Sequence, residues 1–495
     1  MTAVPSIDPR TGTAAEIVTT ETTAAQVDQI CRAALAAADP LNALGRDGRA
    51  ALLNTLAEAL EAHREPIVAL ADRETALGAV RLNGELTRTT YQLRLFADVL
   101  RDGGYLEATV DHAGVTPMGP RPDLRRMLVP LGPVAVFGAS NFPLAFSVPG
   151  GDTASALAAG CPVVAKAHGS HPATSQLCFD VLEAAARQAG APTGALGIVH
   201  GVRPGADLVA HPVIRAAAFT GSTAGARALM GVIDQRPDPI PFFGELSSLN
   251  PVVVTPAAAA DRAADIGTGL AESFTLGAGQ FCTKPGLAFV PDGEAGDELV
   301  TAIRDTIAAT APMVMLNAGI GSAYEKGTAR LGVTTSPGTP LLLTTTAAGL
   351  PPEATEECFG PVMVVARYVG EADLFAALDT LPASLTATVH RGSDETRLPG
   401  DLTRRLLSRA GRIVYDGYPT GVAVAWAQHH GGPWPATNTQ HTSVGATAIR
   451  RFLRPVAWQN APAELLPVEL RDDCRDLPRR VDGVAHPAVS APGAP

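Results

Sequence analysis

The sequence predicts an α/β protein built on a doubly wound parallel sheet, with a second α/β region after it. Between residues 132 and 246, short apolar runs alternate with helical stretches at regular spacing, which is typical of parallel strands joined by crossover helices. The same alternation returns between residue 250 and about residue 424. The chain has 495 residues, more than one hydrophobic core usually supports, so we expect several structural units.

The first 110 residues predict a helical lead-in to the first sheet. Residues 22–101 are rich in Ala, Leu, Arg and Glu, with a period compatible with amphipathic helices. Prolines and glycines interrupt this pattern in residues 111–127. Such residues favour an extended connector or a hairpin there.

Five apolar runs predict the strands of the first sheet, which we place in a domain of residues 128–249. The runs are 133–137, 162–166, 195–199, 214–219 and 240–243. Ligands of such sheets bind at the carboxyl ends of the strands. The polar or small residues that fall at these ends are Ser140, Asn141, Lys166, His168, Gly221 and Ser222.

The second α/β region, residues 250–424, contains five more strand candidates. They are 251–254, 287–290, 362–368, 385–389 and 411–415. A loop and C-terminal segment of residues 425–479 follow. Residues 480–495 are rich in Pro and Ala, and this composition predicts a mobile tail.

Composition excludes several classes of protein. With 46% hydrophobic and 18% charged residues, the chain can fill a large core, and disorder over its bulk is not expected. The net charge of -11 is spread along the chain, without the basic run and interleaved aromatics of a nucleic-acid site. Neither a signal peptide nor an apolar stretch of membrane length is found. A cytoplasmic protein with no membrane or nucleic-acid partner is therefore expected.

Cys282 is the most informative residue of the sequence. It lies in the Gly-rich segment 277–283, and Glu245 precedes it by 37 residues. A thiol in such a loop, with a carboxylate able to fold toward it, is suited to covalent chemistry on a carbonyl group. The thiolate attacks the carbonyl carbon, and the carboxylate then activates water.

Four segments, taken in their order along the chain, together resemble the aldehyde dehydrogenase superfamily. They are residues 219–223, 244–246, 279–283 and 357–361. The resemblance extends from about residue 51 to residue 467. It is closest to the 2-oxoglutarate semialdehyde (2,5-dioxovalerate) dehydrogenases and the related NADP-dependent fatty aldehyde dehydrogenases, on the segments 137–143, 151–162 and 430–437.

The resemblance implies a catalytic role for three residues. Cys282 would be the nucleophile and Glu245 the base for deacylation, while the amide of Asn141 and the backbone N–H of Cys282 would form an oxyanion hole. An aldehyde would then be oxidised to an acid through a thiohemiacetal and a thioester. A thioester-forming or esterase-like activity is the alternative among enzymes, and the presence of Glu245 favours hydrolysis.

The resemblance also implies a nicotinamide cofactor held by the Rossmann-like domain of residues 128–249. The matching residues are Lys166 and Glu357 for the ribose hydroxyls, Phe359 near the nicotinamide, and Gly221 and Ser222 beside the phosphates. Gly169 stands where NAD-preferring relatives often have a glutamate that repels a 2'-phosphate. With Arg203 and His168 nearby as donors, NADP is expected to be preferred and NAD to be usable.

The substrate implied by the closest branch is 2-oxoglutarate semialdehyde, which would be oxidised to 2-oxoglutarate. Its carboxylate needs a cation, and Arg88, Arg94 and Lys284 are candidates that the sequence does not separate. Ala423 and Trp426 depart from the branch. An apolar tunnel lined by Trp426, Phe142 and Phe146, for a longer aliphatic or aromatic aldehyde, therefore stays open.

Several other readings accompany these expectations. The six cysteines lack a CxxC pair, which argues against a disulfide framework or a zinc cluster. No metal site is expected, because the pairs 168/171 and 429/430 of histidines lack a third ligand in metal spacing. Cys358 is interpreted as a packing residue, with a redox partner for Cys282 as the alternative.

The resemblance also implies a homodimer or homotetramer, joined through residues 111–127 and the segment near Pro455. A non-catalytic relative that serves as a binding protein is the alternative from another class of function.

Overall fold

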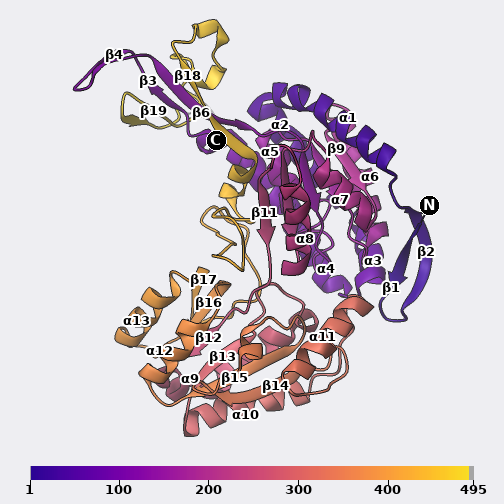
Figure 1. The fold of residues 1–495 in the computed structure, drawn as a ribbon, viewed down its shortest axis with the longest axis vertical. Coiled ribbons are helices and arrows are strands. Elements are labelled where there is room, and N and C mark those ends of the chain that lie inside the picture. Colours follow the sequence, from indigo (N-terminus) through magenta and orange to yellow (C-terminus); the bar gives the residue numbers. More distant parts are fainter. Residues whose placement is uncertain (1, 490–495) are drawn as a thin grey trace.

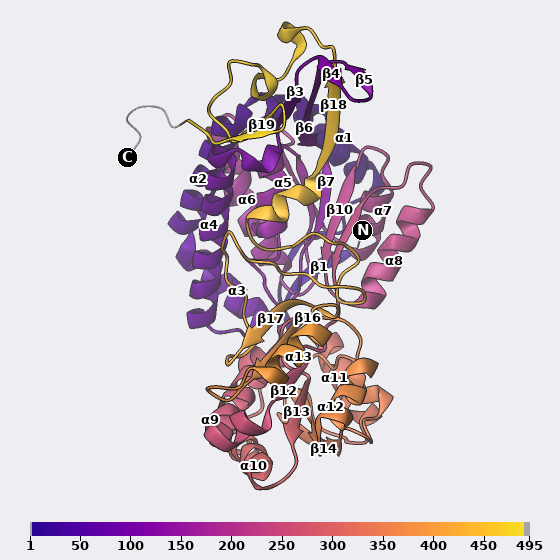
Figure 2. The same cartoon turned by 90° about the vertical axis from the view of Figure 1, so that its left-hand side faces the viewer.

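A computed structural model describes residues 2–489 of the chain. Figure 1 shows an elongated molecule, in which one α/β unit with its helices occupies the upper part and a second occupies the lower part. A β arm projects from the upper end, and Figure 2 shows the C-terminal strands lying in this arm beside the strands that follow the first helices. No helix among these residues is long and apolar enough to cross a membrane.

The helical lead-in is confirmed for residues 22–101 and is wrong for the residues before them. The helices are α1 (Ala24–Ala43), α2 (Gly45–Ala62), α3 (Arg64–Thr75) and α4 (Ala79–Asp102). Before them, β1 (Ala3–Asp8) pairs in antiparallel fashion with β2 (Thr13–Thr20). Most residues of β2 are exposed, so this strand lacks the alternating burial that would have shown it in the sequence.

The five predicted strands of the first sheet are confirmed, and they are parallel in the order β11-β10-β7-β8-β9. Their bounds are β7 (Val134–Phe137), β8 (Val163–Lys166), β9 (Leu196–Val199), β10 (Ala216–Thr220) and β11 (Phe242–Glu245). The helices between them are α5 (Gly151–Ala159), α6 (Pro172–Gln188), α7 (Val202–Ala210) and α8 (Thr223–Asp234).

Helices cover both faces of this sheet, as a doubly wound fold requires. Successive side chains of a strand point to opposite faces. Accordingly, Val134 and Val136 of β7 pack into the core shared with α2 to α6, whereas Ala135 and Phe137 pack into the core shared with α1, α7 and α8. The carboxyl ends of β7, β8, β10 and β11 thereby meet at one edge of the sheet.

The second sheet has six parallel strands in the order β14-β15-β13-β12-β16-β17. They are β12 (Val252–Val254), β13 (Leu287–Pro291), β14 (Leu341–Thr346), β15 (Val362–Tyr368), β16 (Ser384–His390) and β17 (Ala410–Tyr415). Its helices are α9 (Pro256–Thr275), α10 (Glu294–Ala308), α11 (Ala318–Arg330), α12 (Glu371–Thr380) and α13 (Arg397–Leu406). The strand β14 was not predicted, because it lies at the edge of the sheet and is only partly buried.

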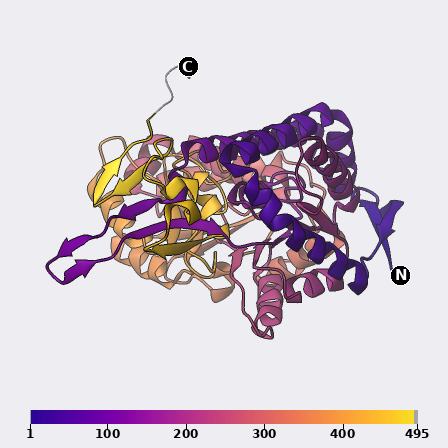
Figure 3. The ribbon, with the colours of Figure 1, turned by 90° about the horizontal axis from the view of Figure 1, so that it is seen from above.

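The β arm brings both ends of the upper unit together. It contains β3 (Thr109–Asp111), β6 (Leu124–Pro130), β18 (Leu453–Gln459), β19 (Arg479–Val481) and β20 (Val484–His486), in the order β18-β6-β3-β19-β20. The hairpin β4 (Gly114–Thr116) and β5 (Gly119–Arg121) extends from it, as Figure 3 shows from above.

The prediction of a mobile tail from residue 480 is wrong for its first part. Arg480 and Val481 pair with Thr109 and Val110 of β3, and the buried guanidinium of Arg479 donates to the carbonyl oxygen of Arg471 at 2.6 Å. These contacts fix a segment whose composition alone indicated a tail. Residues 490–495 of the predicted tail lie outside the described residues. The oligomeric role of the arm stays a prediction.

Candidate active site

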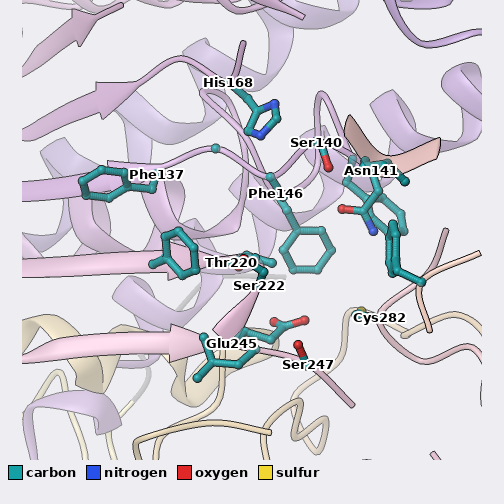
Figure 4. A pocket seen from close by; sticks show the side chains of 18 of the residues that line it. Phe137, Ser140, Asn141, Phe146, His168, Thr220, Ser222, Glu245, Ser247 and Cys282 are labelled. Carbon is teal, nitrogen blue, oxygen red and sulfur yellow. The ribbon is translucent and has the colours of Figure 1, made fainter. Parts of the chain in front are cut away.

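A cavity of about 410 Å³ lies at the carboxyl edge of the first sheet, where the loop of Cys282 reaches it. Figure 4 shows Asn141, Phe146 and Glu245 around the space next to Cys282. Nine of the ten predicted site residues line this cavity. They are Asn141, Lys166, His168, Gly221, Ser222, Glu245, Cys282, Glu357 and Phe359.

The loop before Cys282 has a backbone that few residues can adopt. Gly277, Ala278 and Gly279 have positive φ angles of 57°, 60° and 64°, a region that favours glycine. A Cβ atom at Gly279 would lie 2.3 Å from the carbonyl group of Gly360, so a larger residue would displace the loop. The side-chain amide of Asn250 then donates to the carbonyl oxygen of Cys282 at 2.8 Å. These contacts hold the thiol in place.

A histidine that the sequence analysis did not select connects the predicted nucleophile and base. His430 Nε2 lies 3.5 Å from Cys282 Sγ and 2.7 Å from Glu245 Oε1. The hydroxyl of Ser443 donates to the other oxygen of Glu245 at 2.7 Å. Because one nitrogen faces both groups, a proton held there can be shared with the sulfur or with the carboxylate.

The electrostatics of this group favour a charged Glu245 and a neutral Cys282. Burial raises the pKa of Glu245, but the charge and hydrogen bond of His430 and the hydroxyl of Ser443 outweigh it and hold the pKa below its ordinary value. Burial, followed by the charge of Glu245, raises the pKa of Cys282 well above that of a free thiol. At neutral pH the carboxylate is therefore ionised and the sulfur keeps its proton until a base removes it.

The sequence analysis considered His430 only as half of a histidine pair without a third metal ligand. The third ligand is absent in sequence spacing but present in space, because ligand atoms of Glu245, Cys282 and His430 all lie within 4.8 Å of one another. His430 follows Cys282 by 148 residues. Its place at the start of the segment 430–437, one of the segments that carry the family resemblance, was the signal that could have identified it.

Asn141 lies against the loop of the thiol. Its side-chain nitrogen donates to the carbonyl oxygen of Gln280 at 3.0 Å, and its side chain is buried. Arg81 donates to the carbonyl oxygen of Asn141 at 2.7 Å. The amide is thus held two residues from Cys282 in the loop, and it also lines the cavity.

The remaining cavity residues offer groups suited to a dinucleotide. The Lys166 side chain is half-buried, and this burial lowers its pKa. Burial raises the pKa of Glu357 to about 7, although Ser247 donates to it. Gly221 and Ser222 precede α8, and Ser222 caps this helix by accepting from the N–H of Gly225 at 3.2 Å. A cation, a carboxylate and a helix N-terminus in one cavity fit ribose hydroxyls and phosphates.

Two predicted donors to a 2'-phosphate differ in position. Arg203 does not line the cavity: its side chain is 84% exposed and pairs with Asp207 at 2.8 Å. The sequence analysis placed it there because distance along the chain does not show which way a helix surface faces. His168 does line the cavity, but burial lowers its pKa well below the ordinary value. It can therefore donate a hydrogen bond without carrying charge.

The structure separates the three candidate cations for a substrate carboxylate. Lys284 is fully buried, and its ammonium donates to the carbonyl oxygens of Cys358 at 3.1 Å and Val362 at 2.8 Å. Arg94 is exposed on α4. Burial lowers the pKa of Arg88, and the carboxylates of Glu85 and, less strongly, Glu245 are near enough to oppose this effect.

The predicted packing role of Cys358 is confirmed. Its side chain packs in a cluster with Met315 and Tyr324. All six cysteines, including Cys282, are free thiols.

The cavity lies at the edge of a Rossmann-like sheet, and the loop of Cys282 reaches it. This arrangement is that of dehydrogenases that use both a nicotinamide dinucleotide and a catalytic thiol. The chain belongs to the aldehyde dehydrogenase family, whose sequence profile matches residues 1–316. It is therefore an oxidoreductase that uses NAD or NADP to oxidise an aldehyde.

Relatives and solved structures agree with this membership. Alpha-ketoglutaric semialdehyde dehydrogenase 2 of Azospirillum brasilense is 44% identical over 93% of this chain and 92% of its own length. Alpha-ketoglutaric semialdehyde dehydrogenase of Acinetobacter baylyi is 43% identical over 93% of this chain and 91% of its own. The crystal structure of an NADP-dependent enzyme of E. coli has the same fold, with a TM-score of 0.78 at 22% identity, over 92% of this chain and 94% of the other.

Proposed function

We propose that this enzyme oxidises 2-oxoglutarate semialdehyde to 2-oxoglutarate, with Cys282 as nucleophile and Glu245 as the base for deacylation. The observation that carries the chemistry is the contact of both groups with His430 Nε2, at 3.5 Å for the sulfur and 2.7 Å for the carboxylate. The substrate rests on the two relatives that are named for this aldehyde and are 43–44% identical to the chain.

Cys282 adds to the aldehyde carbon, and its proton leaves toward the pair formed by His430 and Glu245. The aldehyde oxygen becomes negative in this step. We assign the stabilisation of this charge to Asn141 and the backbone N–H of Cys282, and a donor of this kind typically contributes about 3 kcal/mol in the transition state. The bound dinucleotide supplies the hydride acceptor, and the residues that would hold it are Lys166, Glu357, Phe359 and the Gly221–Ser222 turn.

A thioester on Cys282 remains after the oxidation and must be hydrolysed. Glu245 is buried, ionised and held by Ser443 and His430, so it can remove a proton from water that attacks the thioester. The acid then leaves, and Cys282 is restored. Relatives that transfer the acyl group to another acceptor have no need of this carboxylate.

The substrate assignment is tested by following absorbance at 340 nm with a panel of aldehydes. We expect kcat/KM to be highest for 2-oxoglutarate semialdehyde, by about 100-fold over pentanal, because a buried charge-assisted pair commonly contributes this much to discrimination. A preference for octanal or benzaldehyde would overturn the assignment. The mechanism would stand, and Phe142 and Phe146, which line the cavity, would then be part of an apolar pocket.

For the cofactor we propose a preference for NADP, with NAD usable. Gly169 follows His168 in the turn after β8, and a Cβ atom at this glycine would meet nothing within 4 Å. No acidic side chain stands at this position to repel a 2'-phosphate.

The variant Gly169→Glu should lower kcat/KM for NADP by about 30-fold and leave the value for NAD within about threefold, because two negative charges in contact repel each other. Steady-state kinetics with both dinucleotides measure this effect. Gly169→Gln is the matched control, since it adds the same bulk without charge. Equal losses with both dinucleotides in Gly169→Glu would contradict the proposal.

We also propose that the β arm joins subunits into a homodimer or homotetramer. Two segments support this proposal. The hairpin β4–β5 and the first part of β6 fall in residues 111–127, the connector that the family resemblance assigns to oligomerisation, and β18 comes from the segment around Pro455. We also propose that the enzyme works in the cytoplasm.

A further inference from the structure

Arg88 has two guanidinium nitrogens that find no hydrogen-bond acceptor in the described part of the chain. Both terminal nitrogens, Nη1 and Nη2, are out of contact with water and have no hydrogen-bond partner among residues 2–489. Only Nε is engaged, in a long contact of 3.4 Å with the carbonyl oxygen of Val422. Burying a guanidinium group without an acceptor costs free energy. An anion bound beside these two nitrogens would supply the missing acceptor.

The acid one turn away on α4 does not satisfy this charge. One oxygen of Glu85, Oε1, accepts from the backbone N–H groups of Leu144 and Ala145, and the other has no partner in the described chain. Complete burial also raises the pKa of Glu85, which reduces the negative charge that it can place beside Arg88. Glu85 therefore fixes the backbone of residues 144 and 145. The two terminal nitrogens of Arg88 remain without an acceptor in the described chain.

The guanidinium of Arg88 is connected to the thiol by a short series of side-chain contacts. Its guanidinium carbon lies 4.8 Å from the centre of the Phe146 ring, and the centre of that ring lies 6.3 Å from the centre of the His430 ring. His430 in turn touches the sulfur of Cys282. Phe146 lines the cavity, whereas Arg88 does not. Arg88 thus lies behind Phe146, outside the space assigned to the dinucleotide.

The other cations near the thiol donate to carbonyl oxygens of the chain, although Arg81 has one further nitrogen, Nη1, without a partner among the described residues. Arg412 donates to the carbonyl oxygens of Gly421 at 3.1 Å and Pro419 at 2.6 Å, and so holds the loop that contains Val422. Arg81 donates to the carbonyl oxygen of Asn141, and Lys284 to two carbonyl oxygens. Arg88 is the one guanidinium of this group with two terminal nitrogens to offer, which matches the two oxygens of a carboxylate.

We propose that Arg88 binds the carboxylate of the substrate and thereby selects aldehydes that carry an acid at the opposite end. This inference rests on the proposed function, because it assumes an acidic aldehyde. In a five-carbon oxo-acid aldehyde, the carboxylate is about 5 Å from the aldehyde carbon by covalent geometry. With that carbon on Cys282, the acid extends past the His430 and Phe146 side chains toward the two free nitrogens.

The test compares Arg88→Met with wild type on two aldehydes, 2-oxoglutarate semialdehyde and uncharged pentanal. Methionine keeps much of the apolar stem and removes a buried charge. We expect kcat/KM for the acidic aldehyde to fall about 100-fold, through KM more than through kcat, while the value for pentanal stays within about threefold. Arg94→Met, on the exposed side of the same helix, is the matched control and should change neither value.

The deciding quantity is kcat/KM for 2-oxoglutarate semialdehyde divided by kcat/KM for pentanal. A fall of this ratio in Arg88→Met but not in Arg94→Met supports the proposal, whatever substrate the wild type prefers. Equal losses for both aldehydes would overturn it, and so would no loss for the acid. Arg88→Lys, which keeps a charge but has about three N–H donors in place of about five, should retain at least about one tenth of the wild-type ratio. The proposed function fails separately, if wild type itself favours apolar aldehydes.

Discussion

Replacing Cys282 with alanine should abolish aldehyde oxidation, with a loss in kcat of about 10⁴-fold or more, as expected when a covalent nucleophile is removed. No other described sulfur can take its place. Cys358, which lies nearest in the sequence, packs against Tyr324. Absorbance at 340 nm with the preferred aldehyde measures the loss.

The same variant should still bind the dinucleotide, because Lys166, Ser222 and Glu357 are untouched. Quenching of protein fluorescence on titration with NADPH shows whether it does. Cys474→Ala is the matched control, since that thiol lies in the segment that packs on the β arm and should leave activity unchanged. Wild-type activity in Cys282→Ala would refute the assignment of the nucleophile.

Replacing Glu245 with glutamine should separate the two halves of the reaction. The oxidation step should still occur, giving a rapid release of one NADPH per subunit, whereas steady-state turnover should fall about 10³-fold because water loses its base. Stopped-flow absorbance measures the burst, and the mass of the intact protein should show the acyl group on Cys282. Hydroxylamine, which needs no base to attack a thioester, should restore turnover.

The geometry of His430 gives this experiment a second informative outcome. Its Nε2 connects Glu245 to the sulfur, so the carboxylate could be required before the thiol attacks. In that case the burst disappears together with turnover, and hydroxylamine restores nothing. Such a result would move Glu245 from the hydrolysis of the thioester to the activation of the thiol.

Sequence reasoning predicted the two sheets because their strands are buried. The runs at β7, β12 and β13 are continuously apolar, and buried strands of this kind are visible without any knowledge of their partners. β2 and β14 were missed because they are exposed or lie at an edge. The pairing of β19 with β3 was missed because it joins segments about 370 residues apart, which local composition does not report.

The site was predictable where its residues stand in short motifs. Cys282, Glu245 and Asn141 fall in such segments, and nine of the ten predicted residues line one cavity. Arg203 does not line this cavity, because the direction of its side chain from α7 depends on tertiary packing. Arg88 could not be separated from Arg94 and Lys284 for the same reason: what distinguishes the three is the set of acceptors that each one meets after folding.

The hydrogen bond between Ser443 and Glu245 sets the time at which this enzyme can first work. During synthesis the chain leaves the ribosome from its N-terminus, at about 5–20 residues per second. Residue 443 follows Glu245 by 198 positions, so Glu245 waits roughly 10–40 s for this partner at that rate. An unfinished chain therefore carries an unassisted thiol, and aldehydes in the cell meet a competent nucleophile only on a nearly complete protein.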